Sequence, residues 1–227
     1  MSNTWIYRVG LTVEEINKYL DANLSDEDIK NFLNQQLLKF KFLSIENALR
    51  GHIDETLGKP YKYYTSMRDE APEIFSCSSL ISYLYVFAGV WMPSLVIDKF
   101  FYFPQIDKKD LRFGDIVFSY NEDDHPLRTT SKDYLPNQLT TDKKVNHLGM
   151  YMGDGKILQA SGNWYKGKVL IENLEESPSF KNIVSYGRVV PDLSEKKFVI
   201  EIPSDRIDMR SKEGLLIELK KLWQTNK

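Results

Sequence analysis

The chain has 227 residues, of which 42% are hydrophobic, 13% aromatic and 27% charged, a balance that is typical of a globular domain and excludes an intrinsically disordered chain. Its 30 Lys and Arg residues nearly match its 32 Asp and Glu residues, so no net charge attracts nucleic acid or an anionic bilayer. The single cysteine, Cys77, excludes an intramolecular disulfide and leaves a free thiol to explain.

Three short amphipathic helices are predicted before residue 60. The first begins at a capping box, Thr12 to Glu15, and the next two begin after Ser25 and Ser44. Ser and Thr favour such starts because their hydroxyl oxygen accepts from the unpaired N–H groups of a first helical turn. Gly58 followed by Pro60 is the stop signal that ends the third helix.

A fourth helix, Ser76 to Phe87, is apolar on nearly every side, so we expect it to lie buried. After Pro93 the pattern changes to short β-type runs. The predicted strands are Asp115 to Tyr120, His147 to Met152, Lys156 to Ala160, Lys168 to Glu172 and Ile183 to Val190. Helices followed by an antiparallel sheet indicate an α+β fold.

A polar insert, residues 121–144, separates the first two predicted strands. Its length is typical of a lid or binding loop, and equally of a mobile surface loop. The tail adds a strand, Phe198 to Ile202, and an amphipathic helix, Lys212 to Trp223. We predict an N-terminal helical extension, residues 1–43, and one α+β domain, residues 44–227, which includes this C-terminal strand and helix.

Cys77 lies where a loop becomes the buried helix. The unpaired N–H groups and the positive end of the helix dipole favour the thiolate there, and the thiolate is the reactive form of cysteine. The alternative is a small buried hydrophobe, because free cysteines are among the most buried residues. The position of Cys77 by itself leaves both interpretations open.

His147 opens a predicted strand whose small and apolar residues point toward a core. An imidazole has the pKa that suits the base of a nucleophilic cysteine, although a hydrogen-bonded core histidine is the commoner case. Gln159 lies twelve residues later, and a hairpin would place it beside His147. There its side-chain oxygen can accept from the imidazole and select the tautomer. A solvated strand face also explains Gln159.

Metal and nucleotide sites find no support in the sequence. His52 precedes the buried helix and His125 lies in the polar insert, where surface roles are commoner. One cysteine and three scattered histidines lack the spacings of a zinc site, and no glycine-rich nucleotide loop is present. We therefore expect no metal, no cofactor and no nucleic-acid partner.

Four segments together resemble the NlpC/P60 family of papain-like cysteine peptidases, which act on the cell wall. In chain order they are Gly58 to Tyr61, Cys77-Ser78 opening a helix that ends at Gly89, Phe113 to Phe118, and His147 to Ala160. The resemblance in order and spacing spans roughly residues 44–190.

This resemblance implies a papain-like α+β domain in which Cys77 attacks, His147 is the general base and Gln159 orients the base. It implies hydrolysis of an amide bond in a peptidoglycan-derived peptide, with no cofactor. Backbone N–H groups, including that of Cys77, would hold the oxyanion of the tetrahedral intermediate.

The resemblance also assigns Tyr61, Ser76 and Ser78 to substrate binding, around the nucleophile. Tyr61 matches an aromatic position of the family, although a half-buried loop aromatic is the alternative. The family usually reads Asp-Cys-Ser-Gly, whereas this chain has Ser76 and Ser79 at the outer positions, and Lys62 to Thr65 replace a pair of glycines. These departures imply a reshaped binding cleft.

Two alternatives stay open. One is an amidase, esterase or acyltransferase of the same fold on a substrate outside the wall. The other is a binding protein with a retired catalytic site, whose helical extension has an unknown protein partner.

Residues 1–8 lack the basic start and apolar core of a signal peptide. We therefore expect a cytoplasmic protein as written, or one exported to the cell wall by a non-standard route. No apolar run approaches the roughly 20 residues of a membrane span, so we expect no membrane insertion.

Overall fold

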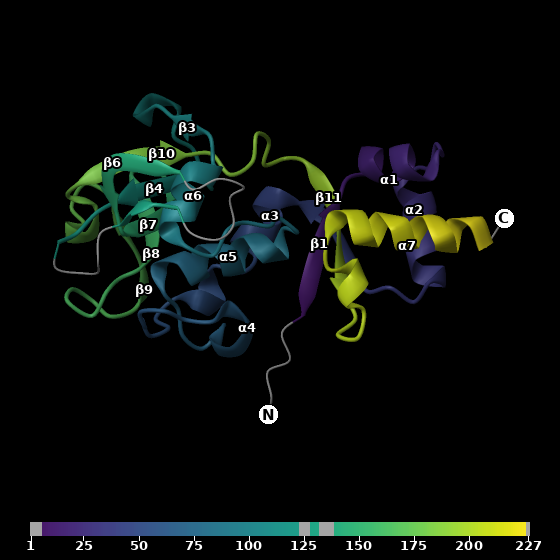
Figure 1. The fold of residues 1–227 in the computed structure, drawn as a ribbon, viewed down its shortest axis with the longest axis horizontal. Coiled ribbons are helices and arrows are strands. Elements are labelled where there is room, and N and C mark those ends of the chain that lie inside the picture. Colours follow the sequence, from purple (N-terminus) through teal and green to yellow (C-terminus); the bar gives the residue numbers. More distant parts are fainter. Residues whose placement is uncertain (1–5, 123–127, 132–138, 226–227) are drawn as a thin grey trace. The chain divides into compact units, whose positions relative to one another are not determined.

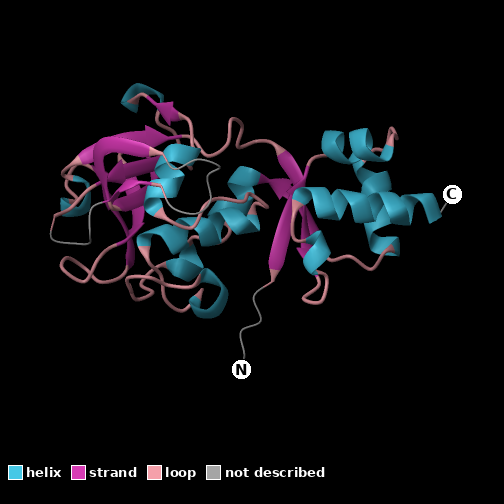
Figure 2. Ribbon diagram, viewed as in Figure 1, coloured by secondary structure: helices cyan, strands magenta, loops and turns pink. Residues whose placement is uncertain are grey.

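The computed structural model of the chain describes residues 6–122, 128–131 and 139–225. The chain divides into two compact units, drawn in Figure 1. The first contains residues up to 51, residues 85–91 and residues from 192 onward, and the second contains residues 52–84 and 92–191. Each unit combines helices and strands (Figure 2).

The first unit is built on an antiparallel three-stranded sheet of order β1-β11-β2. Figure 1 shows α1, α2 and α7 on one side of this sheet. Apolar side chains of these helices and of the strands form a buried core, in which the rings of Phe32 and Trp223 meet edge to face. The elements are β1 Tyr7–Leu11, α1 Val13–Leu20, α2 Asp26–Gln35, β2 Phe40–Ser44, α3 Ile45–Arg50, β11 Lys196–Ile202, a 3₁₀ turn Ile207–Met209 and α7 Lys212–Thr225.

The predicted helix starts of this unit are confirmed. The Thr12 hydroxyl accepts from the Glu15 N–H and the Glu15 carboxylate accepts from the Thr12 N–H, which is a complete capping box. Ser25 and Ser44 accept in the same way at α2 and α3. The third helix is shorter than expected, because α3 ends at Arg50.

Strands β1 and β2 were not predicted, since the sequence indicated only helices in this region. Both are edge strands on β11, and the register pairs Tyr7 with Ile202 and Ser44 with Lys196. The C-terminal strand and helix therefore belong with the N-terminal elements, and this division differs from the predicted boundary between residues 43 and 44. The physical reason is that strand pairing joins segments that are distant in sequence.

The second unit is built on a six-stranded antiparallel sheet of order β3-β10-β4-β7-β8-β9. Its helices and strands are α4 Met67–Glu70, α5 Cys77–Phe87, α6 Val96–Tyr102, β3 Gln105–Ile106, β4 Ile116–Ser119, β5 Arg128–Thr130, β6 Thr140–Val145, β7 His147–Gly153, β8 Lys156–Ala160, β9 Val169–Asn173 and β10 Ile183–Gly187. Three 3₁₀ turns lie at Asp54–Thr56, Lys108–Asp110 and Pro178–Phe180. From Tyr85 onward, the end of α5 is assigned to the first unit.

The α+β prediction is confirmed, and each of the five predicted strands of the sheet is present with ends within a few residues. Helix α6 was missed, because its β-branched and aromatic residues resemble a strand locally. It packs against the sheet through Phe100, whose ring meets Phe118 of β4 edge to face at 5.6 Å. No helix among the described residues has the length and apolarity that a membrane crossing requires.

The polar insert between β4 and β7 is described only in part. Residues 128–131 and 139–145 contain β5 and β6, which form a separate two-stranded sheet. Residues 123–127, which include His125, and residues 132–138 lie outside the described residues.

Two glycines of the first unit approach each other closely. The Gly10 N–H donates to the Gly89 carbonyl at 3.2 Å, and Gly89 has a left-handed φ of +64°. A Cβ on Gly89 would lie 2.4 Å from the Gly10 backbone. Gly89 therefore meets both a conformational and a steric requirement.

We predict that Gly89→Ala lowers the free energy of unfolding by more than about 2 kcal/mol, because it adds a backbone clash to the cost of a left-handed φ. Gly58→Ala is the matched control, since Gly58 also has a positive φ (+75°) but has open space around it. That control should lose only about 1 kcal/mol. Urea unfolding followed by circular dichroism measures both, and equal losses would contradict the proposed clash.

Candidate functional site

The first turn of α5 is capped by a reciprocal pair of serines. The Ser76 hydroxyl accepts from the Ser79 N–H at 3.2 Å, and the Ser79 hydroxyl accepts from the Ser76 N–H at 2.9 Å. The Thr65 hydroxyl also accepts from the Ser76 N–H at 2.9 Å. Both serines depart from the usual family pattern, and the structure places them together in this cap.

Cys77 is the first residue of α5 and is buried, with 5% of its surface exposed. It follows the capping residue directly, because the Leu80 N–H donates to the Ser76 carbonyl at 3.1 Å. The thiol therefore sits at the positive end of the helix, where N–H groups of the first turn have no partner within the helix. This is the location that the sequence predicted for Cys77.

Ser78, the next residue, is tied to α6 rather than directed at solvent. Its hydroxyl donates to the Ser94 carbonyl and accepts from the Lys99 Nζ at 2.7 Å. Lys99 is fully buried, and it was not identified from the sequence. Burial lowers the pKa of Lys99 to about 7, while the charges of Cys77 and Asp98 act to raise it. The available signal was a pair of charged residues, Asp98 and Lys99, inside an otherwise apolar run.

His147 and Gln159 are brought together, as the hairpin pattern predicted. The antiparallel register pairs Met150 with Leu158, which makes His147 and Gln159 diagonal neighbours on adjacent strands β7 and β8. The His147 Nε2 and the Gln159 Oε1 lie 2.7 Å apart, and both residues are buried. The ring of Phe180 packs against the imidazole at 5.3 Å between centroids.

Glu172 of β9 determines how the Gln159 amide is oriented. Its carboxylate accepts from the Gln159 Nε2 at 2.5 Å, from the Ser177 hydroxyl at 2.6 Å and from the Tyr165 hydroxyl at 3.1 Å. A carboxylate only accepts, so the amide nitrogen of Gln159 faces Glu172 and its oxygen faces His147. That oxygen also only accepts, so the hydrogen lies on Nε2 of His147. The neutral ring then keeps Nδ1 as its basic nitrogen.

Glu172, Ser177 and Tyr165 were missed by the sequence analysis. Glu172 lies in a predicted strand, and the register of that strand was the information needed to identify it. The structure pairs Glu172 with Ile157, which makes it a diagonal neighbour of Gln159 on the same face of the sheet.

Tyr61 lies near the start of α5 along the backbone. It forms a parallel bridge with Phe75, and the Lys62 N–H donates to the Phe75 carbonyl at 2.9 Å. Tyr61 is buried, with 6% of its surface exposed. This pairing holds the segment around Tyr61 next to the residues that precede Cys77.

Metal ligands do not gather among the described residues, in which no group of three or more His, Cys, Asp or Glu side chains could hold an ion. His52 lies beside Glu55, with 2.8 Å between Nδ1 and the carboxylate. His125 lies outside the described residues.

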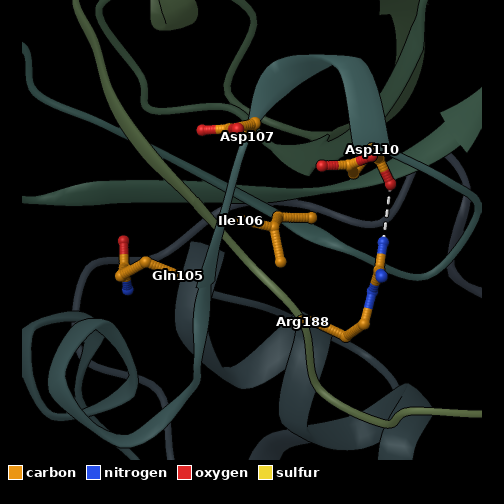
Figure 3. A pocket seen from close by; sticks show the side chains of 5 residues that line it. All are labelled: Gln105, Ile106, Asp107, Asp110 and Arg188. Carbon is orange, nitrogen blue, oxygen red and sulfur yellow. Dashed lines mark hydrogen bonds between the residues drawn. The ribbon is translucent and has the colours of Figure 1, made fainter.

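A pocket of about 380 Å³ lies in the second unit (Figure 3). Its lining residues are Gln105, Ile106, Asp107, Asp110 and Arg188. Arg188 points toward Asp110 and donates to its carbonyl at 2.6 Å and to the Asp115 carboxylate at 2.8 Å. The guanidinium thus fastens the turn before β4, and no predicted site residue lines this pocket.

Comparison with known proteins finds relatives over part of the chain. No protein-family model matches it. It is 26% identical over 133 residues to the probable endopeptidase p60 of Listeria monocytogenes, a match that covers 59% of this chain and 22% of that protein. The chain thus matches less than a quarter of the length of this curated relative.

Solved structures whose names include NlpC or NlpC/P60 are also similar to this chain. NlpC1 from Trichomonas vaginalis has a TM-score of 0.48 and 23% identity, covering 64% of this chain and 44% of that one. An NlpC/P60 family protein from Bacillus cereus has a TM-score of 0.48 and 20% identity, covering 64% and 40%.

The orientation of Gln159 predicts the tautomer of His147. In protein labelled with ¹⁵N-histidine, at a pH where the ring is neutral, His147 should show the pattern of the Nε2–H tautomer. Glu172→Gln should give a mixture of tautomers, because the new amide accepts or donates equally well. Loss of signals in a His147→Gln variant assigns them.

The matched control is Glu175→Gln, since Glu175 is exposed and paired with Lys108 on the surface. It should leave the His147 signals unchanged. An Nδ1–H tautomer in the unaltered protein would contradict the assigned orientation of Gln159.

Proposed function

From the assignment of this chain to the NlpC/P60 family, which its motifs and its p60 relatives support, we infer that it is a cysteine hydrolase of peptidoglycan-type peptides. The observation that carries the proposal is the chain of hydrogen bonds from the half-buried Glu172 through the buried Gln159 to the buried His147. Such a chain orients an imidazole, as a third member of a catalytic triad does. The p60 relatives are named endopeptidases, which supports an amide bond as the target.

In the proposed mechanism Cys77 is the nucleophile and His147 is the base. The Nδ1 nitrogen of His147 takes the thiol proton, and the sulfur attacks the carbonyl carbon of the substrate amide. N–H groups of the first turn of α5, including that of Cys77, hold the resulting oxyanion. The imidazolium then donates its proton to the leaving amine, and an acyl-enzyme thioester forms.

Water completes the reaction. His147 removes a proton from water, the resulting hydroxide attacks the thioester, and the sulfur leaves with the proton returned by the imidazolium. Gln159 stabilises each imidazolium by accepting from its Nε2–H, and Glu172 keeps the Gln159 oxygen turned toward the ring.

The three residues assigned to substrate binding take different parts in this proposal. Ser76 caps α5 and Ser78 ties it to α6, so both act by holding the first turn in place. Tyr61 is retained as the substrate-contacting member, since its backbone is paired with the segment that leads to Cys77.

We predict that the protein releases new amine and carboxyl ends from purified peptidoglycan, detected by mass spectrometry of the soluble fragments. Cys77→Ala should abolish this release and keep the circular dichroism spectrum, because losing one sulfur removes little buried area. A generic acyl ester tested in parallel separates peptide hydrolysis from a general esterase. Wall digestion by a folded Cys77→Ala variant would contradict the proposal.

Gln159→Ala should lower kcat by about one to three powers of ten, roughly 1.4 to 4 kcal/mol of transition-state stabilisation, with a smaller effect on KM. His147→Ala should be nearly inactive, because it removes the base rather than its orientation. Glu175→Ala is the matched control, since Glu175 is exposed and paired with Lys108 on the surface, and it should keep the kcat of the unaltered protein. Steady-state kinetics on the cleaved fragment measures all three, and a fast Gln159→Ala variant would give the orienting role to another residue, with Asn163 the next candidate.

A further inference from the structure

Lys99 of α6 is a buried lysine that the proposed mechanism does not use, and it is an ammonium at pH values below its pKa of about 7. None of its surface is exposed. Its ammonium donates to Ser78 and Ser82 hydroxyls at 2.7 and 2.9 Å and to the Pro93 and Ser94 carbonyls at 2.5 and 3.3 Å. The Nζ group therefore links two successive turns of α5 to the segment between the helices.

This geometry places a positive charge against the start of α5. Ser78 immediately follows Cys77, and Ser82 lies one helical turn further on. The titratable groups that act on the ammonium are Cys77 from α5 and Asp98 from its own helix, and each raises the pKa of Lys99 against the lowering effect of burial. By reciprocity, an ammonium at this place favours the ionised form of Cys77.

Packing alone does not account for a lysine here. Transferring an ammonium from water to a protein interior costs several kcal/mol, and an apolar side chain of similar volume avoids that cost. The three N–H groups of the ammonium reach four oxygens and offset part of the cost, yet these oxygens are neutral and form no ion pair with the lysine. A buried lysine whose pKa lies near 7 is thus the property that needs a reason.

We propose that Lys99 is a positioning residue for Cys77, whose buried ammonium holds the first turn of α5 through Ser78 and Ser82 and favours the thiolate of the neighbouring cysteine. This inference rests on the proposed role of Cys77 as nucleophile. Lys99 would add a second electrostatic stabilisation of the thiolate, from α6, to the one that the N-terminus of α5 provides.

The test is the rate at which iodoacetamide alkylates Cys77, measured against pH by mass spectrometry on the protein without substrate. Because Cys77 is the single cysteine of the chain, the modified mass reports on one thiol. In Lys99→Met the midpoint of the rate profile should rise by about one pH unit, with about tenfold slower alkylation below the midpoint. If Lys99 had a purely structural role, the variant would change the access of iodoacetamide to Cys77 and therefore the limiting alkylation rate. The midpoint of the pH profile would then stay unchanged.

Lys108→Met is the matched control, since it removes one exposed lysine of the same unit that pairs with Glu175. Its midpoint should equal that of the unaltered protein. If Lys99→Met does not fold, Lys99→Gln decides, because the amide keeps a donor for Ser78 and removes only the charge. An unchanged midpoint in the folded variant overturns the proposal.

Repeating the measurement in a His147→Ala background tests whether Lys99 acts on the Cys77 thiol directly or only through His147. A shift by Lys99→Met that persists there supports the action of Lys99 on the thiol independently of the histidine. Loss of the shift in that background overturns it. Absence of wall digestion would refute the proposed function while leaving this electrostatic measurement intact.

Discussion

The hydrogen bond between the Glu172 carboxylate and the Gln159 amide is the constraint from which the candidate site follows. An amide by itself presents a donor and an acceptor with nearly equal shape, so it cannot select a tautomer. A carboxylate on the next strand removes that ambiguity, and the direction of each later hydrogen bond is then determined. The result is a His147 whose Nε2 carries a hydrogen, so that Nδ1 is the acceptor nitrogen of the neutral ring, and the antiparallel register of three strands sets this arrangement.

The start of α5 is stabilised by two independent arrangements. Within the helix, the serine pair Ser76 and Ser79 satisfies N–H groups of the first turn. From α6, Lys99 reaches the same turn through Ser78, and α6 is itself held on the sheet by the contact of Phe100 with β4. A fixed helix start matters for the proposed chemistry, since oxyanion donors contribute only when they are preorganised.

The sequence by itself determined the features that depend on local chemistry. The capping residues located the starts of α1, α2 and α3, because their hydroxyl and carboxylate groups act within one helical turn. Short β-type runs located five of the six strands of the large sheet, and the two-residue strand β3 was not predicted. The contact of His147 with Gln159 was predictable for the same reason, since a short hairpin joins them and leaves few registers to consider.

Tertiary structure alone decided the features that depend on distant partners. Strands β1 and β2 are five-residue edge strands whose partner β11 comes from the far end of the chain. No local sequence pattern predicts that pairing. Helix α6 has strand-like composition, and burial against the sheet overrides that preference. Lys99 and Glu172 read as ordinary charged residues in sequence. Only the burial of Lys99 beside α5 shows what its amine contacts, and only the pairing of β9 with β8 shows that Glu172 contacts Gln159. The free energy of a charge inside a protein depends on the groups around it.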